Sequence, residues 1–105
     1  ITYSGLQAVT KEDLQPFPTL ILLNLSYNKL KELASDLFIY TPNIQHLYLH
    51  NNQIASIGLN CLTPLNNLKL IHLKDNVIIN KNAETPQDIL NLKMELFMLA
   101  MSSKP

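Results

Sequence analysis

The sequence predicts an α/β solenoid, a leucine-rich arc of stacked coils with short parallel strands on its concave side. An eleven-residue apolar pattern recurs three times with a period of 24 residues, and each copy shows the alternation typical of a strand. The pattern stops after residue 78, and helical spacing of apolar residues follows it. We expect irregular or 3₁₀ segments on the convex side and a C-terminal capping helix. At 105 residues, the chain forms one domain.

The repeated pattern begins at Leu20, Ile44 and Leu68 and reads L-x-x-L-x-L-x-x-N-x-L, with isoleucine replacing leucine freely. Because strand side chains alternate between two faces, the leucines of L-x-L point inward and the x residues point outward. One coil cannot bury its own apolar side, whereas stacked copies form a continuous core. The predicted organisation is a partial repeat at 1–19, repeats at 20–43, 44–67 and 68–85, and a capping helix at 86–101.

The partial repeat precedes the first full copy by the same period. Leu6, Val9 and Leu14 stand 24 residues before the corresponding apolar positions of the first full copy. Residues 1–4 then supply the remains of a fourth parallel strand, so the chain begins in the middle of a repeat. This is expected of an excised piece, or of an array whose N-terminal cap has been removed. The sequence does not begin with a basic stretch followed by an apolar one, so no signal peptide is predicted in this form.

Each copy of the pattern has an asparagine at its ninth position, namely Asn28, Asn52 and Asn76. An asparagine side chain carries both a carbonyl and an amide group, so it can satisfy backbone donors and acceptors of neighbouring turns. We therefore predict a structural ladder formed by these three side chains. After it, Thr85-Pro86-Gln87-Asp88 is typical of a helix start, with Thr85 as N-cap and Pro86 at the first helical position.

These motifs resemble the leucine-rich-repeat family, and Phe38 stands where the 24-residue "typical" repeat carries its last apolar residue. The segment 75–80 and the helix after it resemble the C-terminal end of secreted insect proteins of this family. The resemblance implies non-catalytic protein–protein recognition on the concave face, an extracellular location, and a role in innate immunity or adhesion. Those insect proteins commonly carry a pair of cap cysteines, which this chain lacks. An intracellular adaptor is the alternative location and role.

The outward strand positions define the candidate partner-binding face, which is rich in Tyr, His and Asn and carries only two formal charges. Aromatic groups with a polar atom bury much area at low entropic cost, as protein interfaces require. Tyr48 lies near the middle and is the strongest hot-spot candidate. Thr2 and Tyr3 extend the face. The candidate residues are Tyr27, His46, Tyr48, His50, Asn51, His72, Lys74 and Asp75.

All three histidines, His46, His50 and His72, fall on this face. Four residues of strand separate the first two by about 13 Å, and no cysteine or convergent carboxylate completes a ligand set, so no metal site is predicted. Protonation below pH ~6.5 would make the face positive, which leaves a pH switch as an alternative to simple contact residues.

Other function classes lack their motifs. The net charge is zero and every basic residue is Lys, which disfavours a nucleic-acid interface. No P-loop, GxGxxG, HExxH or convincing Ser–His–acid arrangement is present, so neither enzyme activity nor a cofactor is predicted. No apolar run reaches the ~18 residues that a membrane span requires.

Two single residues carry separate expectations. Cys61, the only cysteine, is expected to be a small buried core residue, with an intermolecular disulfide as the alternative. Asn24-Leu25-Ser26 is the one N-x-S sequon, so a glycan on Asn24 would project from the concave face if the protein is secreted.

The predicted partner is a protein of unspecified identity. The alternative is self-association into a homodimer, either through the unpaired sheet edge at residues 1–4 or through the apolar helix segment 96–101.

Overall fold

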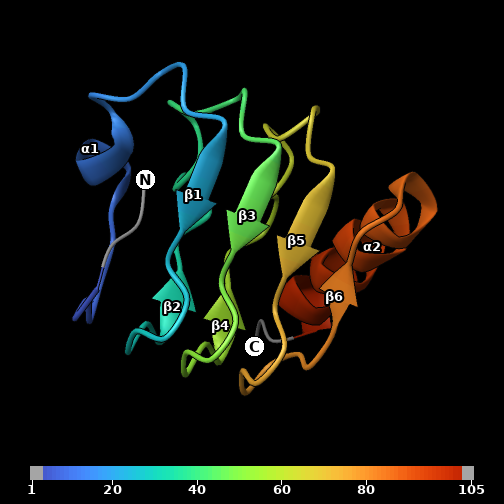
Figure 1. Ribbon diagram of the computed structural model, residues 1–105. Helices are drawn as coiled ribbons and strands as arrows, with labels where there is room; N and C mark the ends of the chain where they lie inside the picture. The colour runs from blue at the N-terminus through green and yellow to red at the C-terminus, as the bar shows by residue number, and fades with distance from the viewer. Residues whose placement is uncertain (1–3, 103–105) are drawn as a thin grey trace.

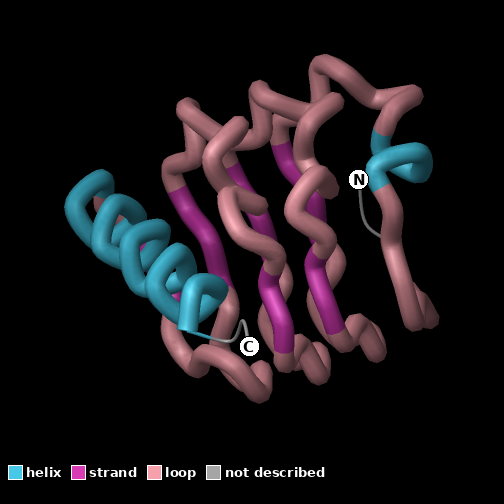
Figure 2. Tube along the Cα trace, turned by 180° about the vertical axis from the view of Figure 1, so that it is seen from behind, coloured by secondary structure: helices cyan, strands magenta, loops and turns pink. Residues whose placement is uncertain are grey.

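The computed structural model describes residues 4–102, which fold into coils stacked side by side (Figure 1). The helices α1 (Lys11–Leu14) and α2 (Pro86–Ser102) lie at opposite ends of the stack (Figures 1 and 2). Between them run two sheets, whose strands are β1 (Leu22–Asn24), β2 (Glu32–Leu33), β3 (His46–Tyr48), β4 (Ser56–Ile57), β5 (Leu70–His72) and β6 (Asn82–Ala83).

The main sheet has the strand order β1-β3-β5-β6, and its first three strands are parallel. Leu23 pairs with Leu47, and Leu47 pairs with Ile71, so the register of the sheet equals the 24-residue period of the sequence. The parallel sheet and the C-terminal helix of the expected fold are therefore confirmed. Any pairing by residues 1–3, which include Thr2 and Tyr3, lies outside the described residues.

A second, shorter parallel sheet joins β2 to β4, with Glu32 opposite Ser56 and Leu33 opposite Ile57. The expected irregular segments are thus partly replaced by strands of two residues, together with turns and the single helical turn α1. The coils approach closely here, because a Cβ atom built on Gly58 would lie only 2.4 Å from the backbone nitrogen of Ser35. Gly58 therefore permits this spacing between neighbouring coils.

The core is a column of leucine and isoleucine side chains between the two sheets. Leu23, Leu47 and Ile71 are fully buried, and so are the next inward residues Leu25 and Leu49. Phe38 fills the remaining space in the first full repeat and is also fully buried. Each strand thus contributes its inward side chains to one shared core, which leaves the intervening side chains on the opposite face.

The asparagine side chains connect successive coils. Asn52 Nδ2 donates to the carbonyl oxygens of Leu25 and Leu49 at 2.9 and 3.0 Å, while its Oδ1 accepts from Leu30 N at 3.1 Å. Asn76 repeats the arrangement one period later, with donation to Leu49 O and Leu73 O and acceptance from Ile54 N. Asn28 accepts from Leu6 N at 2.8 Å, so the same contact also ties the partial repeat to the stack.

The fourth strand of the main sheet, β6, is an addition to the sequence-based prediction. Three of the four expected parallel strands are β1, β3 and β5, and the fourth, expected at residues 1–4, lies mostly outside the described residues. The sequence did not predict β6, which lies within the predicted repeat 68–85 after the periodic pattern has stopped and runs antiparallel to β5. The chain reverses after Asp75, and its side chains replace the missing next coil. Asn80 Oδ1 accepts from Asp75 N at 2.8 Å, and Asn82 Oδ1 accepts from Leu73 N at 3.0 Å. These bonds satisfy backbone donors that the earlier coils pair with their neighbours.

The C-terminal helix begins where the Thr85 signal predicts it. Thr85 Oγ1 accepts from Asp88 N at 3.2 Å, and the helix ends at Ser102, one residue beyond the predicted bound. It packs against β4 and β6 through four buried side chains. These are Ile89, Leu92, Leu96 and Ala100. No helix in residues 4–102 is both long enough and apolar enough to cross a bilayer.

We predict that Asn52→Ala lowers the free energy of unfolding by about 1–3 kcal/mol, because it leaves the buried amide of Leu30 without its acceptor and removes one of the two donors to each of the carbonyls of Leu25 and Leu49. Urea denaturation measures the difference. Asn66→Ala is the matched control, since Asn66 is exposed and should tolerate the change within about 0.5 kcal/mol. Equal stability of the two variants would contradict the structural role of the ladder.

Candidate functional site

The outward side chains of the main sheet form the candidate site. The inward leucines hold each strand in place, and the parallel register sets equivalent outward residues beside one another: Asn24 with Tyr48, and Tyr48 with His72. His46 stands between Leu22 and Leu70 in the preceding row. The face is therefore ordered in columns that cross the strands, one residue from each coil.

Four aromatic rings on this face contact one another edge to face. Tyr48 lies 5.1 Å from His72 and 6.2 Å from His50 between ring centroids. His50 in turn lies 5.7 Å from His72 and 5.2 Å from Tyr27. The rings come from three successive coils and form one continuous patch, which we call the ring patch (Tyr27, Tyr48, His50 and His72). Edge-to-face contacts of this kind stabilise aromatic groups in fixed positions.

The turn after each strand has a repeated left-handed residue. Tyr27, Asn51 and Asp75 have φ angles of 57°, 58° and 61°, and they are spaced by the 24-residue period. Tyr27 N donates to His50 O, and Asn51 N donates to Lys74 O, both at 3.0 Å. Asparagine and aspartate tolerate this backbone conformation, whereas a bulky tyrosine does so at a cost in energy. Tyr27 is nevertheless 71% exposed, so little burial offsets the strain.

The charge on the face depends on pH. Burial lowers the pKa of His50, the neighbouring His72 lowers it further, and Asp75 opposes these effects. His50 Nδ1 is buried and has no hydrogen-bond partner among the described residues. His72 Nε2 lies 3.0 Å from Glu84 Oε2, so this carboxylate from the segment after β6 joins the site. Lys74 and Asp75, which follow β5 in the sequence, are exposed at the rim of the site.

The structure brings together some predicted residues and separates others. Tyr27, Tyr48, His50 and His72 meet, while His46 lies outside their ring contacts. Asn51 adopts the left-handed backbone conformation that the turn after β3 requires. Sequence reasoning missed Glu84, because it lies after residue 78, where the periodic pattern has stopped, and no spacing relates it to His72. The antiparallel pairing of His72 with Asn82 places it there.

The remaining candidates have mainly structural surroundings. In residues 4–102, no three His, Cys, Asp or Glu side chains are grouped to hold a metal ion. Cys61 is buried, as predicted, and burial together with Asp36 raises the pKa of its thiol to about 12. Asn24 is half-buried, and its Oδ1 accepts a hydrogen bond from Ser26 N at 3.0 Å. A glycan attached there would stand beside Tyr48.

The sequence is similar to a known protein family and to a curated relative. The profile of the family described as "Leucine rich repeat" matches residues 1–54 and 18–78, which together span most of the chain. Osteomodulin from Rattus norvegicus is 29% identical over an alignment of 80 residues, and the match covers 58% of this chain and 19% of osteomodulin. The chain therefore spans about a fifth of the length of this curated relative. No solved structure matches the chain significantly.

We predict that Tyr27→Asn raises the free energy of unfolding by about 1 kcal/mol, because asparagine relieves the strain of the left-handed backbone. Chemical denaturation measures the change. Tyr27→Phe keeps the same backbone cost and should leave stability within about 0.5 kcal/mol of wild type. If Tyr27→Asn is less stable than Tyr27→Phe, the ring contact with His50 outweighs the strain.

We also predict that acid destabilises the protein partly through His50. Its folded-state pKa is lowered, so the unfolded chain binds the proton more readily and stability falls as pH drops below about 6.5. His50→Gln should reduce the decrease in melting temperature between pH 7.5 and 5.5. A decrease as large as that of wild type would show that His50 does not contribute to the acid sensitivity.

Proposed function

Since the chain belongs to the leucine-rich-repeat family, we propose that it is a non-catalytic module that recognises a protein partner through the ring patch. In this proposal the chain is a solenoid, and the patch lies on its concave face. The partner contacts Tyr48 near the centre, Tyr27 and His72 on either side, and the charged residues Lys74 and Asp75 at the rim.

The ring contacts are the observation that carries this proposal. Interface hot spots are enriched in tyrosine, and they cluster where rigid side chains can exclude water. The patch meets these conditions, because its four rings support one another across three coils. The strained backbone of Tyr27 adds to the case, since strain retained on an exposed side chain is characteristic of functional positions.

We further propose that the protein is secreted and acts in adhesion or innate immunity. The support is the resemblance to the extracellular typical-repeat class, together with the N-x-S sequon at Asn24. Glycosylation of Asn24 would cover one side of Tyr48 and restrict the partner to the His50 and His72 side. An intracellular adaptor with the same binding face is the alternative.

Self-association is the second candidate function. Exposed apolar side chains on α2 favour it, since apolar surface of this kind often marks an interface between proteins. These side chains are Leu90, Met94, Phe97, Met98 and Met101. A homodimer formed there would leave the ring patch free, so light scattering and partner binding report on separate surfaces.

The test uses unglycosylated protein produced in bacteria and immobilised as bait for the secreted proteins of its source. A protein captured by the wild type is then purified, and its Kd is measured against the variants. Tyr48→Ala should weaken binding about 30-fold, as expected for a hot spot worth about 2 kcal/mol. Glu32→Ala, on the second sheet, is the control and should bind as the wild type does.

Two results would contradict the proposal. One is a captured protein that binds Tyr48→Ala and wild type equally, which would place recognition elsewhere. The other is a stable dimer without any captured protein, which would favour self-association. Melting curves of each variant establish that the loss of binding is not a loss of fold.

A further inference from the structure

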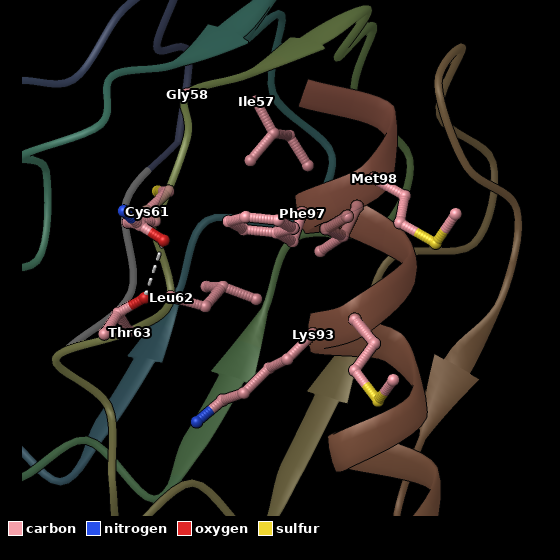
Figure 3. A pocket seen from close by; sticks show the side chains of 11 residues that line it. Ile57, Gly58, Cys61, Leu62, Thr63, Lys93, Phe97 and Met98 are labelled. Atoms are coloured by element: carbon pink, nitrogen blue, oxygen red, sulfur yellow. Dashed lines mark hydrogen bonds between the residues drawn. The ribbon is translucent and has the colours of Figure 1, made fainter. Parts of the chain in front are cut away.

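A groove separate from the ring patch lies between α2 and the turn that follows β4 (Figure 3). Its volume is about 250 Å³. Six apolar side chains supply most of its wall, and three of them come from exposed positions on the helix. They are Ile57, Leu62, Met94, Leu96, Phe97 and Met98. Methionine side chains are flexible and polarizable, so they can adapt to an inserted apolar group.

Lys93 places a positive charge at this apolar groove. Figure 3 shows its side chain leaving the helix near Leu62 and ending away from Ile57 and Phe97. Its Nζ donates to the carbonyl oxygen of Leu65 at 2.8 Å, which uses one of three donors. No carboxylate of residues 4–102 lies within 4.0 Å of this ammonium group, in contrast to Lys11 and Lys81, which form ion pairs.

An ammonium group that is half-buried without a counter-ion is unfavourable, because desolvation penalises its charge. Burial accordingly lowers the pKa of Lys93. A ligand carboxylate would supply the missing negative charge and accept hydrogen bonds from the remaining N–H groups of Lys93. Thr63 and Asn60, whose side-chain oxygens lie 3.4 Å apart, add polar groups to the wall of the groove.

We propose that this groove binds a medium-chain monocarboxylate, with the alkyl chain among Ile57, Leu62 and Phe97 and the carboxylate at Lys93. A cavity of about 150 Å³ holds one benzene molecule, so by proportion this groove holds an alkyl chain of about ten carbon atoms. The site combines an apolar wall with one charged group, which is the composition typical of small-molecule sites. It is independent of the protein-recognition function proposed above.

The experiment is calorimetric titration of the full chain with hexanoate, octanoate, decanoate and dodecanoate. Each added CH₂ should tighten binding about fourfold until the groove is full near ten carbons, after which the gain should stop. Decanol and decylammonium have the same chain without the negative charge. Both should bind at least about tenfold more weakly than decanoate, because they lack the charge-assisted hydrogen bond to Lys93.

Lys93→Gln should weaken decanoate binding at least about tenfold while leaving decanol binding unchanged. Lys29→Gln removes an exposed lysine of the first repeat and should bind decanoate as wild type does. Because Lys93 also bonds Leu65, Lys93→Arg is included as a variant that keeps the charge, and it should retain most of the affinity.

The proposal is overturned if decanoate binds no better than decylammonium, or if Lys93→Gln and Lys29→Gln bind decanoate equally. It is also overturned if light scattering shows a dimer that decanoate does not bind and does not dissociate, because a second copy of the chain would then occupy the groove. None of these results bears on Tyr48 or the ring patch, so the two proposals fail separately.

Discussion

The fold depends on hydrogen bonds that cross from one coil to the next at every asparagine of the repeat. Asn52 bonds the backbone of its own coil and of the preceding one, and Asn28 and Asn76 do the same one period away. A coil of this kind has no regular internal ladder to pair its turn residues. The asparagines therefore satisfy buried backbone groups that would otherwise oppose the packing of the leucine core.

Because stacking buries the leucines in one core, the opposite face of the main sheet does not have to contribute to that core. Once Leu23, Leu47 and Ile71 fill the core, the residues between them need only suit a short strand. Chemically varied rings can then stand side by side at the spacing of the strands, which unites residues distant in sequence into one patch. Tyr27 is the exception, because its backbone conformation suits asparagine or aspartate better and its ring still takes part in the patch.

At the C-terminal end of the stack, different residues satisfy the backbone. A sheet that stops leaves backbone donors open, and the reversal after Asp75 supplies Asn80 and Asn82 to accept from them. The helix α2 then covers the core with Ile89, Leu92 and Leu96, while its other side remains exposed. The ring patch thus arises mainly from the strands and turns of the periodic region, whereas the Lys93 groove forms where α2 meets the turn that follows β4.

The sequence alone determined the parallel register, the inward leucines and the position of α2, because each depends on a strict period or on a local capping signal. It could also assign Tyr48 and His72 to one face, since alternation decides the side of a strand. Only the tertiary structure decided that β6 is antiparallel, that Glu84 reaches His72, and that Lys93 has no carboxylate partner among residues 4–102. Those contacts join segments with no common period, so their geometry follows from packing at the end of the stack.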